Sequence, residues 1–155
     1  MTDLTDLLLP ETVLERLTVA NKKALFQQLA TAAAAAYGLE SPAVVEGLAK
    51  REKLGSTGFG GGVATPHARI PGLNHVVGVF ARLAQPIDFQ AVDDLPVDIV
   101  FLLLSPPEAS ALHLKALARV SRRLRDRSFV DKLRGAGSRD AIYALLTADE
   151  ARDAA

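Results

Sequence analysis

The stretch Val97-Asp98-Ile99-Val100-Phe101-Leu102-Leu103-Leu104 decides the fold class of this chain. After Asp98 its side chains are apolar without alternation, which predicts a strand covered by other elements on both faces. The segment 76–83 is also apolar and rich in β-branched residues, and it predicts a second strand. Strands of this kind need helices or a second sheet to cover them.

Helical patterns lie before and after these strands. Asn21 is the predicted N-cap of a helix that runs to Tyr37 and ends at Gly38. Ser41 is the predicted N-cap and Pro42 the first residue of a second helix, which carries Arg51 in its last turn. Further helices are predicted at 108–127, near 129–133 and at 138–146. Helices before, between and after buried strands predict a layered α/β domain.

The helix predicted at 108–127 has two faces. Leu112, Ala116 and Val120 mark its predicted buried stripe. Its arginines are expected to face solvent: Arg119, Arg122, Arg123 and Arg125. The basic run 122–127 has no interleaved aromatic residue, so we interpret it as a solvated face and not as a nucleic-acid site.

The composition predicts one domain over residues 1–155, because 49% hydrophobic residues suffice for a single sizeable core. Eighteen Lys and Arg balance eighteen Asp and Glu, so no net charge draws the protein to nucleic acid or to a membrane surface. The chain has no cysteine, its first ten residues have no Lys or Arg, and its longest strongly apolar run is far below the roughly 20 residues that span a bilayer. We therefore expect a cytoplasmic protein without membrane insertion.

The segment 55–62 has five glycines in eight positions, which predicts a loop in place of a helix or strand. Glycine-rich loops can turn their backbone amides toward an anion. Nucleotide-binding patterns do not fit, because the P-loop lysine is absent and Val63 stands where a Rossmann pattern has its third glycine. We therefore predict a phosphate-binding loop that does not hold a nucleotide. Its predicted contacts are Ser56, Thr57, Gly58 and Gly60.

His67 follows this loop and is the candidate nucleophile. Imidazole is nucleophilic near neutral pH and can hold a phosphoryl group that nearby donors stabilise. Pro66 restricts the backbone before it, so the ring is presented rigidly. This chemistry requires no metal and no cofactor. A zinc hydrolase built on the histidines is a remote alternative, because the usual ligand spacings are absent, and metal analysis of the purified protein tests it.

Other polar residues near these motifs are expected to have structural roles. His75 is interpreted as a surface residue beside Asn74. The nearby acidic residues are interpreted as solvated charges without a catalytic role: Glu52, Asp88, Asp93 and Asp94.

Two motifs, Ser56-Thr57-Gly58-Phe59-Gly60 and Val63-Ala64-Thr65-Pro66-His67, carry a family resemblance. Together they resemble the signature of the mannitol/fructose-type enzyme IIA domains of the bacterial phosphoenolpyruvate-dependent phosphotransferase system. Further similar segments cover nearly the whole chain: Arg51-Glu52, 86–89, 96–98, 99–104 and His113-Leu114. Gly61 and Thr65 depart from many relatives, which have asparagine and an aliphatic residue there.

The resemblance implies an α/β fold with a mixed central sheet flanked by helices. It implies that His67 receives a phosphoryl group from a phosphohistidine carrier protein of the HPr type. His113 is then the second active-site histidine, and Arg51 is the cation beside the phosphoryl group. Both could donate hydrogen bonds to phosphoryl oxygens, since a guanidinium matches their geometry with paired donors. The chain would be a phosphotransferase component that acts as a carrier or regulator.

Three roles for such a phosphoryl group remain open. We expect a free-standing chain without a transfer or membrane domain, and the sequence looks most like the nitrogen-type enzyme IIA. Both features favour a regulator of partners such as a sensor kinase or an ion-transport protein. The alternative is a sugar-uptake enzyme IIA that passes phosphate to an enzyme IIB. A binding module that is never phosphorylated is a third possibility. The face that partners read is expected to include Phe59, Thr65, Ala68, Arg69 and Ile70.

Overall fold

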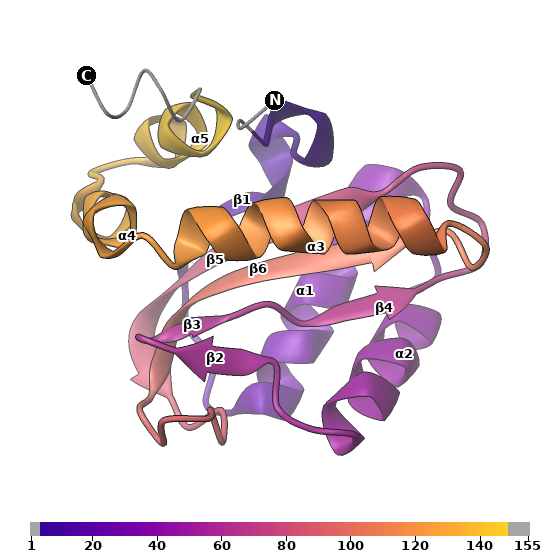
Figure 1. The fold of residues 1–155 in the computed structure, drawn as a ribbon, viewed down its shortest axis with the longest axis horizontal. Coiled ribbons are helices and arrows are strands. Elements are labelled where there is room, and N and C mark those ends of the chain that lie inside the picture. Colours follow the sequence, from indigo (N-terminus) through magenta and orange to yellow (C-terminus); the bar gives the residue numbers. More distant parts are fainter. Residues whose placement is uncertain (1–3, 149–155) are drawn as a thin grey trace.

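The computed structural model describes residues 4–148, in which one mixed sheet lies between two sets of helices (Figure 1). The strands are β1 Val13–Leu17, β2 Gly58–Gly60, β3 Val63–Ala64, β4 His67–Arg69, β5 Val77–Ile87 and β6 Val97–Ser105. The α-helices are α1 Lys22–Tyr37, α2 Ser41–Lys53, α3 Ser110–Leu124, α4 Arg127–Gly135 and α5 Arg139–Thr147. Two short 3-10 turns, η1 Thr5–Leu7 and η2 Pro10–Thr12, precede β1.

The sheet has the order β1-β5-β6-β3-β2, and β4 pairs with β6 beyond the end of β3. Strands β5 and β6 are antiparallel, whereas β1 is parallel to β5 and both β3 and β4 are parallel to β6. Figure 1 places α1 and α2 on one side of this sheet and α3 on the other. The expected mixed sheet with helices on both faces is therefore confirmed.

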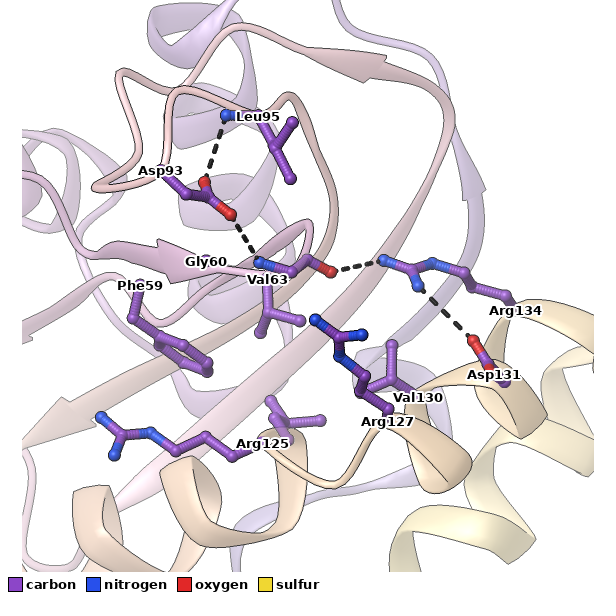
Figure 2. A pocket seen from close by; sticks show the side chains of 12 residues that line it. Phe59, Gly60, Val63, Asp93, Leu95, Arg125, Arg127, Val130, Asp131 and Arg134 are labelled. Carbon is purple, nitrogen blue, oxygen red and sulfur yellow. Dashed lines mark hydrogen bonds and ion pairs between the residues drawn. The ribbon is translucent and has the colours of Figure 1, made fainter.

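The hairpin between β2 and β3 is a turn of three glycines. Gly60, Gly61 and Gly62 all have positive φ angles, of 115°, 69° and 82°. Figure 2 shows how the turn is held: the Asp93 carboxylate accepts from the Gly61 amide at 3.0 Å, and Arg134 donates to the Gly61 carbonyl at 2.9 Å. A Cβ on Gly62 would lie 2.5 Å from Nη2 of Arg134, so only glycine fits there without displacing that side chain. These glycines build a tight turn that is bonded to Asp93 and to Arg134 of α4.

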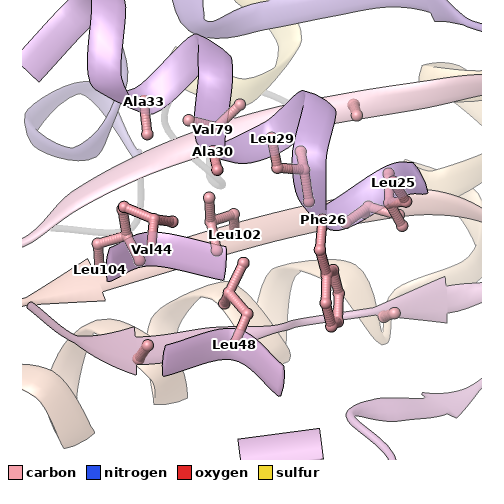
Figure 3. Packing of buried hydrophobic residues seen from close by; sticks show 14 of the residues in the cluster. Leu25, Phe26, Leu29, Ala30, Ala33, Val44, Leu48, Val79, Leu102 and Leu104 are labelled. Atoms are coloured by element: carbon pink, nitrogen blue, oxygen red, sulfur yellow. The ribbon is translucent and has the colours of Figure 1, made fainter. Parts of the chain in front are cut away.

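The central strand β6 is buried on both faces, as its unbroken apolar sequence predicts. Val100, Leu102 and Leu104 belong to the core on the α1 and α2 side, and Ile99, Phe101 and Leu103 belong to the core on the α3 side. Figure 3 shows the first core with its labelled side chains from α1, α2, β5 and β6: Leu25, Phe26, Leu29, Ala30, Ala33, Val44, Leu48, Val79, Leu102 and Leu104.

The local signals at α1 act as predicted. The Asn21 side chain accepts from the amide of Ala24 at 2.8 Å and so caps the helix. Gly38 ends it in the left-handed conformation with φ of 68°. Within residues 4–148, no helix is both long and apolar enough to cross a membrane.

Three parts of the predicted pattern are wrong. The helix predicted at 108–127 is shorter, because α3 ends at Leu124 and α4 begins at Arg127. Leu112, expected in the core, is 57% exposed, whereas Arg123, expected in solvent, is 3% exposed and lies over the Phe129 ring at 3.8 Å. The glycine-rich segment 55–62 is not wholly a loop, because its residues 58–60 form β2 by pairing with β3.

Candidate active site

A cavity of about 400 Å³ opens between α2, β4 and the first turn of α3. It brings together three predicted site residues that are far apart in the sequence: Arg51 from the last turn of α2, His67 from the start of β4 and His113 from α3. The other lining residues are Gly47, Lys50, Leu54, Ala68 and Arg69. Because β4 pairs with β6 and α3 follows β6 directly, the buried strand places both histidines at one end of the sheet.

Gly47 allows α2 to lie close to β4. A Cβ on Gly47 would come within 3.1 Å of the Ala68 Cβ and 3.3 Å of Cδ1 of Ile70. Arg51 lies one helical turn beyond Gly47 and therefore projects from the same face of α2, toward the ring of His67. The close approach of helix and strand thus sets the distance between the arginine and the histidine.

The ring of His67 is held in one tautomer. Its Nδ1 lies 2.9 Å from the carbonyl oxygen of Thr65, and a carbonyl can only accept, so Nδ1 carries the proton. Nε2 of the neutral ring then has a free electron pair, which accepts from Nε–H of Arg51 at 3.2 Å. Arg51 is itself fixed by a bond from Nη1 to the Gly55 carbonyl at 2.8 Å. The nucleophilic atom is therefore Nε2, and it faces a cation.

The environment keeps His67 neutral. Burial lowers its pKa below 6.5, the bond to the Thr65 carbonyl opposes this shift, and the charge of Arg51 adds to it. A neutral imidazole is the nucleophilic form, so the ring is ready to react at neutral pH.

His113 is positioned by a residue that the sequence pattern did not reveal. Ser105, at the end of β6, is fully buried, and its hydroxyl lies 2.5 Å from Nδ1 of His113. The His113 ring lies 5.2 Å from the His67 ring, centroid to centroid. Burial lowers the pKa of His113 as well, and the positive charge that His67 would carry when protonated and the charge of Arg69 add to this effect. When Ser105 donates to Nδ1, the Nε2 atom of the neutral ring carries a proton that it can donate.

The charges around the cavity favour an anion. The lining residues contributed by residues 4–148 include Lys50, Arg51 and Arg69, but no Asp or Glu. A partly enclosed site that is lined only by positive charges attracts an anionic group. The attraction is stronger there than between the same charges in bulk water.

The predicted phosphate contacts of the glycine-rich segment do not line this cavity. The Ser56 hydroxyl donates to the Phe89 carbonyl at 3.0 Å and accepts from the Gly58 amide at 3.1 Å. The Thr57 amide donates to the Glu52 carboxylate at 2.9 Å, and the Thr57 hydroxyl is also bonded to that carboxylate. Their role toward phosphate stays a prediction, and these donors are already engaged inside the protein.

Gly60 does not line this cavity either, and a Cβ on it would come within 3.3 Å of the Asp93 carboxylate.

Glu52 is not a freely solvated charge, because its side chain is 7% exposed and pairs with Lys22 at 2.8 Å. It links α1, α2 and the segment after α2, which keeps Arg51 at the edge of the cavity. The position of Glu52 directly after Arg51 was the sequence signal from which this structural role could have been predicted.

The predicted partner-binding face needs correction. Thr65, Ala68 and Ile70 are buried, with at most 7% of each exposed, because β4 is packed against β6 and α2. Leu54 is an exposed apolar side chain in the lining of the cavity, and the exposed Leu112 and Leu114 flank His113 in the sequence.

The third histidine does not join the site. His75 is exposed, and its Nδ1 lies 2.6 Å from Oδ1 of Asn74, as its surface interpretation expects. Within residues 4–148, no group of three or more His, Cys, Asp and Glu residues has the arrangement of a metal site.

Comparison with known proteins gives a consistent result. Residues 6–149 match the family model described as "Phosphoenolpyruvate-dependent sugar phosphotransferase system, EIIA 2". A nitrogen regulatory protein of Bradyrhizobium diazoefficiens is 51% identical over 143 residues, which cover 92% of this chain and 94% of that protein.

Solved structures agree with this assignment. The nitrogen regulatory protein IIA-Ntr of Neisseria meningitidis has a TM-score of 0.86 and 34% identity, with 92% of this chain and 97% of that chain covered. A chain in the Escherichia coli complex of mannitol enzyme IIA with phosphorylated enzyme IIB matches with a TM-score of 0.75 and 20% identity. The match covers 90% of this chain and 96% of that chain, and it shows that the two share a fold. The chain therefore belongs to the type-2 enzyme IIA family of the phosphoenolpyruvate-dependent sugar phosphotransferase system.

Proposed function

We propose that Nε2 of His67 accepts a phosphoryl group from a phosphohistidine carrier protein of the HPr type in the cytoplasm. The observation that carries this proposal is the fixed tautomer of His67. The Thr65 carbonyl engages Nδ1–H, and the electron pair of Nε2 is directed toward Arg51 and the cavity.

The transfer exchanges one N–P bond for another. Nε2 of His67 attacks the phosphorus atom, and the electron pair of the breaking bond returns to the imidazole of the donor. Positive charge develops on the His67 ring as the new bond forms, and the Thr65 carbonyl stabilises it through Nδ1–H. The chain contributes position and electrostatics, which are the main requirements of phosphoryl transfer.

Arg51 and His113 stabilise the charge on the phosphoryl oxygens. Arg51 is within 3.2 Å of Nε2 before transfer, so its guanidinium is placed beside any group bonded there. His113 donates from Nε2 while Ser105 donates to its Nδ1. Lys50 and Arg69 add positive charge at the rim of the cavity.

The phosphoryl group serves as a regulatory signal in this proposal. Relatives named nitrogen regulatory proteins are up to 51% identical to this chain, which favours regulation over sugar uptake. Phosphorylation adds up to about two negative charges at a site whose lining includes the exposed Leu54. Such a change alters the affinity for a sensor kinase or an ion-transport protein by about tenfold or more.

The test of the acceptor is phosphorylation by phosphoenolpyruvate and the host's own general transfer proteins, followed by measurement of acid-labile phosphate. The wild type and the control His75→Ala are expected to be labelled equally, because His75 lies outside the cavity. The His67→Ala variant should keep its fold and take up no label. Full labelling of His67→Ala would refute the assignment.

A second experiment separates regulation from transport. Pull-downs from cell extract are made with the phosphorylated and unphosphorylated wild type and with His67→Ala. The regulatory role predicts different partner sets for the phosphorylated and unphosphorylated forms. Identical partner sets together with rapid transfer to an enzyme IIB would support the sugar-uptake role instead.

A further inference from the structure

A second cavity, of about 600 Å³, lies at the other end of α3 from His113. It is formed by the β2–β3 hairpin, the 93–95 loop and the connection between α3 and α4. It shares no lining residue with the cavity at His67. Its volume falls within the range of roughly 300–1,000 Å³ that is usual for sites of small molecules.

Apolar side chains form one wall of this cavity. Phe59 is half-buried and presents its ring, and Val63 and Val130 are buried beside it. Figure 2 shows the Phe59 ring lying along the cavity, with Val63 next to it. A partly exposed aromatic ring suits a flat apolar ligand, since such rings gain free energy from offset stacking.

Three arginines reach the same cavity: Arg125, Arg127 and Arg134. Arg134 is already engaged, because it pairs with Asp98 at 2.8 Å and donates to the Gly61 carbonyl. Arg125 and Arg127 form no ion pair with any residue in the range 4–148. The guanidinium carbon of Arg125 lies 5.3 Å from the centre of the Phe59 ring.

The acidic residues of the cavity do not neutralise these two arginines. The Asp93 carboxylate accepts from the amides of Gly61 and Leu95 at 3.0 and 3.1 Å, and Asp131 lies 3.8 Å from Arg134. Asp126 lies between Arg125 and Arg127 in the sequence, and its carboxylate accepts from the Phe129 amide at 3.3 Å. Guanidinium groups bind phosphate oxygens through paired hydrogen bonds, which neutral side chains cannot provide.

We propose that this cavity binds a small aromatic phosphate ester, with its phosphate on Arg125 and Arg127 and its ring against Phe59. The site is separate from His67 and does not depend on the proposed transfer. It would let the protein respond to a small molecule in addition to phosphorylation of His67.

The probe for this proposal is 1-naphthyl phosphate, added to the full-length, unphosphorylated protein and followed by the amide NMR signals. Saturable shifts are expected at Gly61, Val63 and Val130. The Arg125→Gln, Arg127→Gln double variant should bind the probe at least about tenfold more weakly, which is about 1.4 kcal/mol. Arg139→Gln removes an exposed arginine outside the cavity and should leave the affinity unchanged.

Two further probes separate the contributions of charge and ring. Uncharged 1-naphthol and inorganic phosphate should each bind at least about tenfold more weakly than the ester. Shifts confined to Ala68, Arg69 and His113 would overturn the proposal, because the probe would then occupy the first cavity. Equal affinity of the double variant, or no saturable binding, would also overturn it. The latter result is expected if the cavity takes only an acidic segment of a partner protein.

Discussion

The cavity at His67 and the glycine-rich segment 55–62 are neighbours in the sequence but use their polar groups in opposite ways. In the cavity, Nε2 of His67 and the guanidinium of Arg51 are bonded to each other in the lining, where an incoming anionic group can reach them. In the glycine-rich segment, the amide and hydroxyl of Thr57 are bound to Glu52 inside the protein. A glycine-rich segment beside a nucleophile can therefore have a structural role. The anion is expected to bind where hydrogen-bond donors line the cavity. Substitutions in the cavity should alter transfer, and those in the segment should alter stability.

The largest expected effect of the helper residues is on the transfer rate. Arg51→Ala and His113→Ala should each slow phosphorylation by about a hundredfold or more, because each removes one positioned donor. Stopped-flow or quenched-flow transfer from the phosphorylated carrier measures this rate. Arg139→Ala is the control, since it changes an exposed arginine away from the cavity. Normal rates in both variants would show that neither residue assists transfer.

The sequence predicted the long elements and the three cavity residues. The capped helix α1 and the unbroken apolar strand β6 carry their information locally, in a cap, a glycine and a periodicity. The motif around His67 pointed to the nucleophile, and the family resemblance pointed to Arg51 and His113. The structure brings all three to one cavity.

The short elements could not be predicted in this way. Strands β3 and β4 have two and three residues, and they exist because they pair with β6, more than thirty residues later. The exposure of Leu112 and the burial of Arg123 depend on how α3 is rotated against α4 and β6, which no local pattern encodes. Ser105 was missed because a serine at a strand end has no distinctive signal until His113 lies beside it.

The next effect concerns pH. Because burial lowers the pKa of both His67 and His113 below 6.5, the two rings stay neutral in the folded protein while the unfolded chain already takes up protons. The free energy of unfolding should therefore be constant above about pH 6.5 and should fall as the pH drops below it. Chemical denaturation between about pH 5 and pH 8 measures this. The His67→Gln, His113→Gln double variant should lose less stability on acidification, whereas the His75→Gln control should follow the wild type.

A smaller effect is expected in the glycine-rich segment. Thr57→Val removes the hydroxyl that is bonded to the buried Glu52 carboxylate and should destabilise the protein by about 1–3 kcal/mol. Thr31→Val is a matched control, because the Thr31 hydroxyl is exposed and bonds only the Gln27 carbonyl within its own helix. Urea denaturation compares the two. An equal loss in both variants, or a large loss of transfer rate with unchanged stability in Thr57→Val, would break the distinction between cavity and segment.

The smallest effect is expected at Gly61. Its φ of 69° lies in the left-handed region that asparagine tolerates, and a Cβ there would meet no atom within 4 Å. Gly61→Asn should therefore change the free energy of unfolding by less than about 1 kcal/mol. The neighbouring Gly62→Asn should cost clearly more, because its Cβ would collide with Arg134. Equal thermal shifts for the two variants would contradict this account of the turn.

The site of phosphorylation on the His67 ring tests the central claim most directly. The Thr65 carbonyl requires a proton on Nδ1, so the phosphoryl group must form its bond at Nε2. Uniformly ¹⁵N-labelled protein is phosphorylated by the host's transfer proteins, and long-range proton–nitrogen correlations assign both ring nitrogens. We expect phosphate on Nε2 of His67, with the proton of Nδ1 retained. Attachment at Nδ1 of His67, or at either nitrogen of His113, would contradict the account.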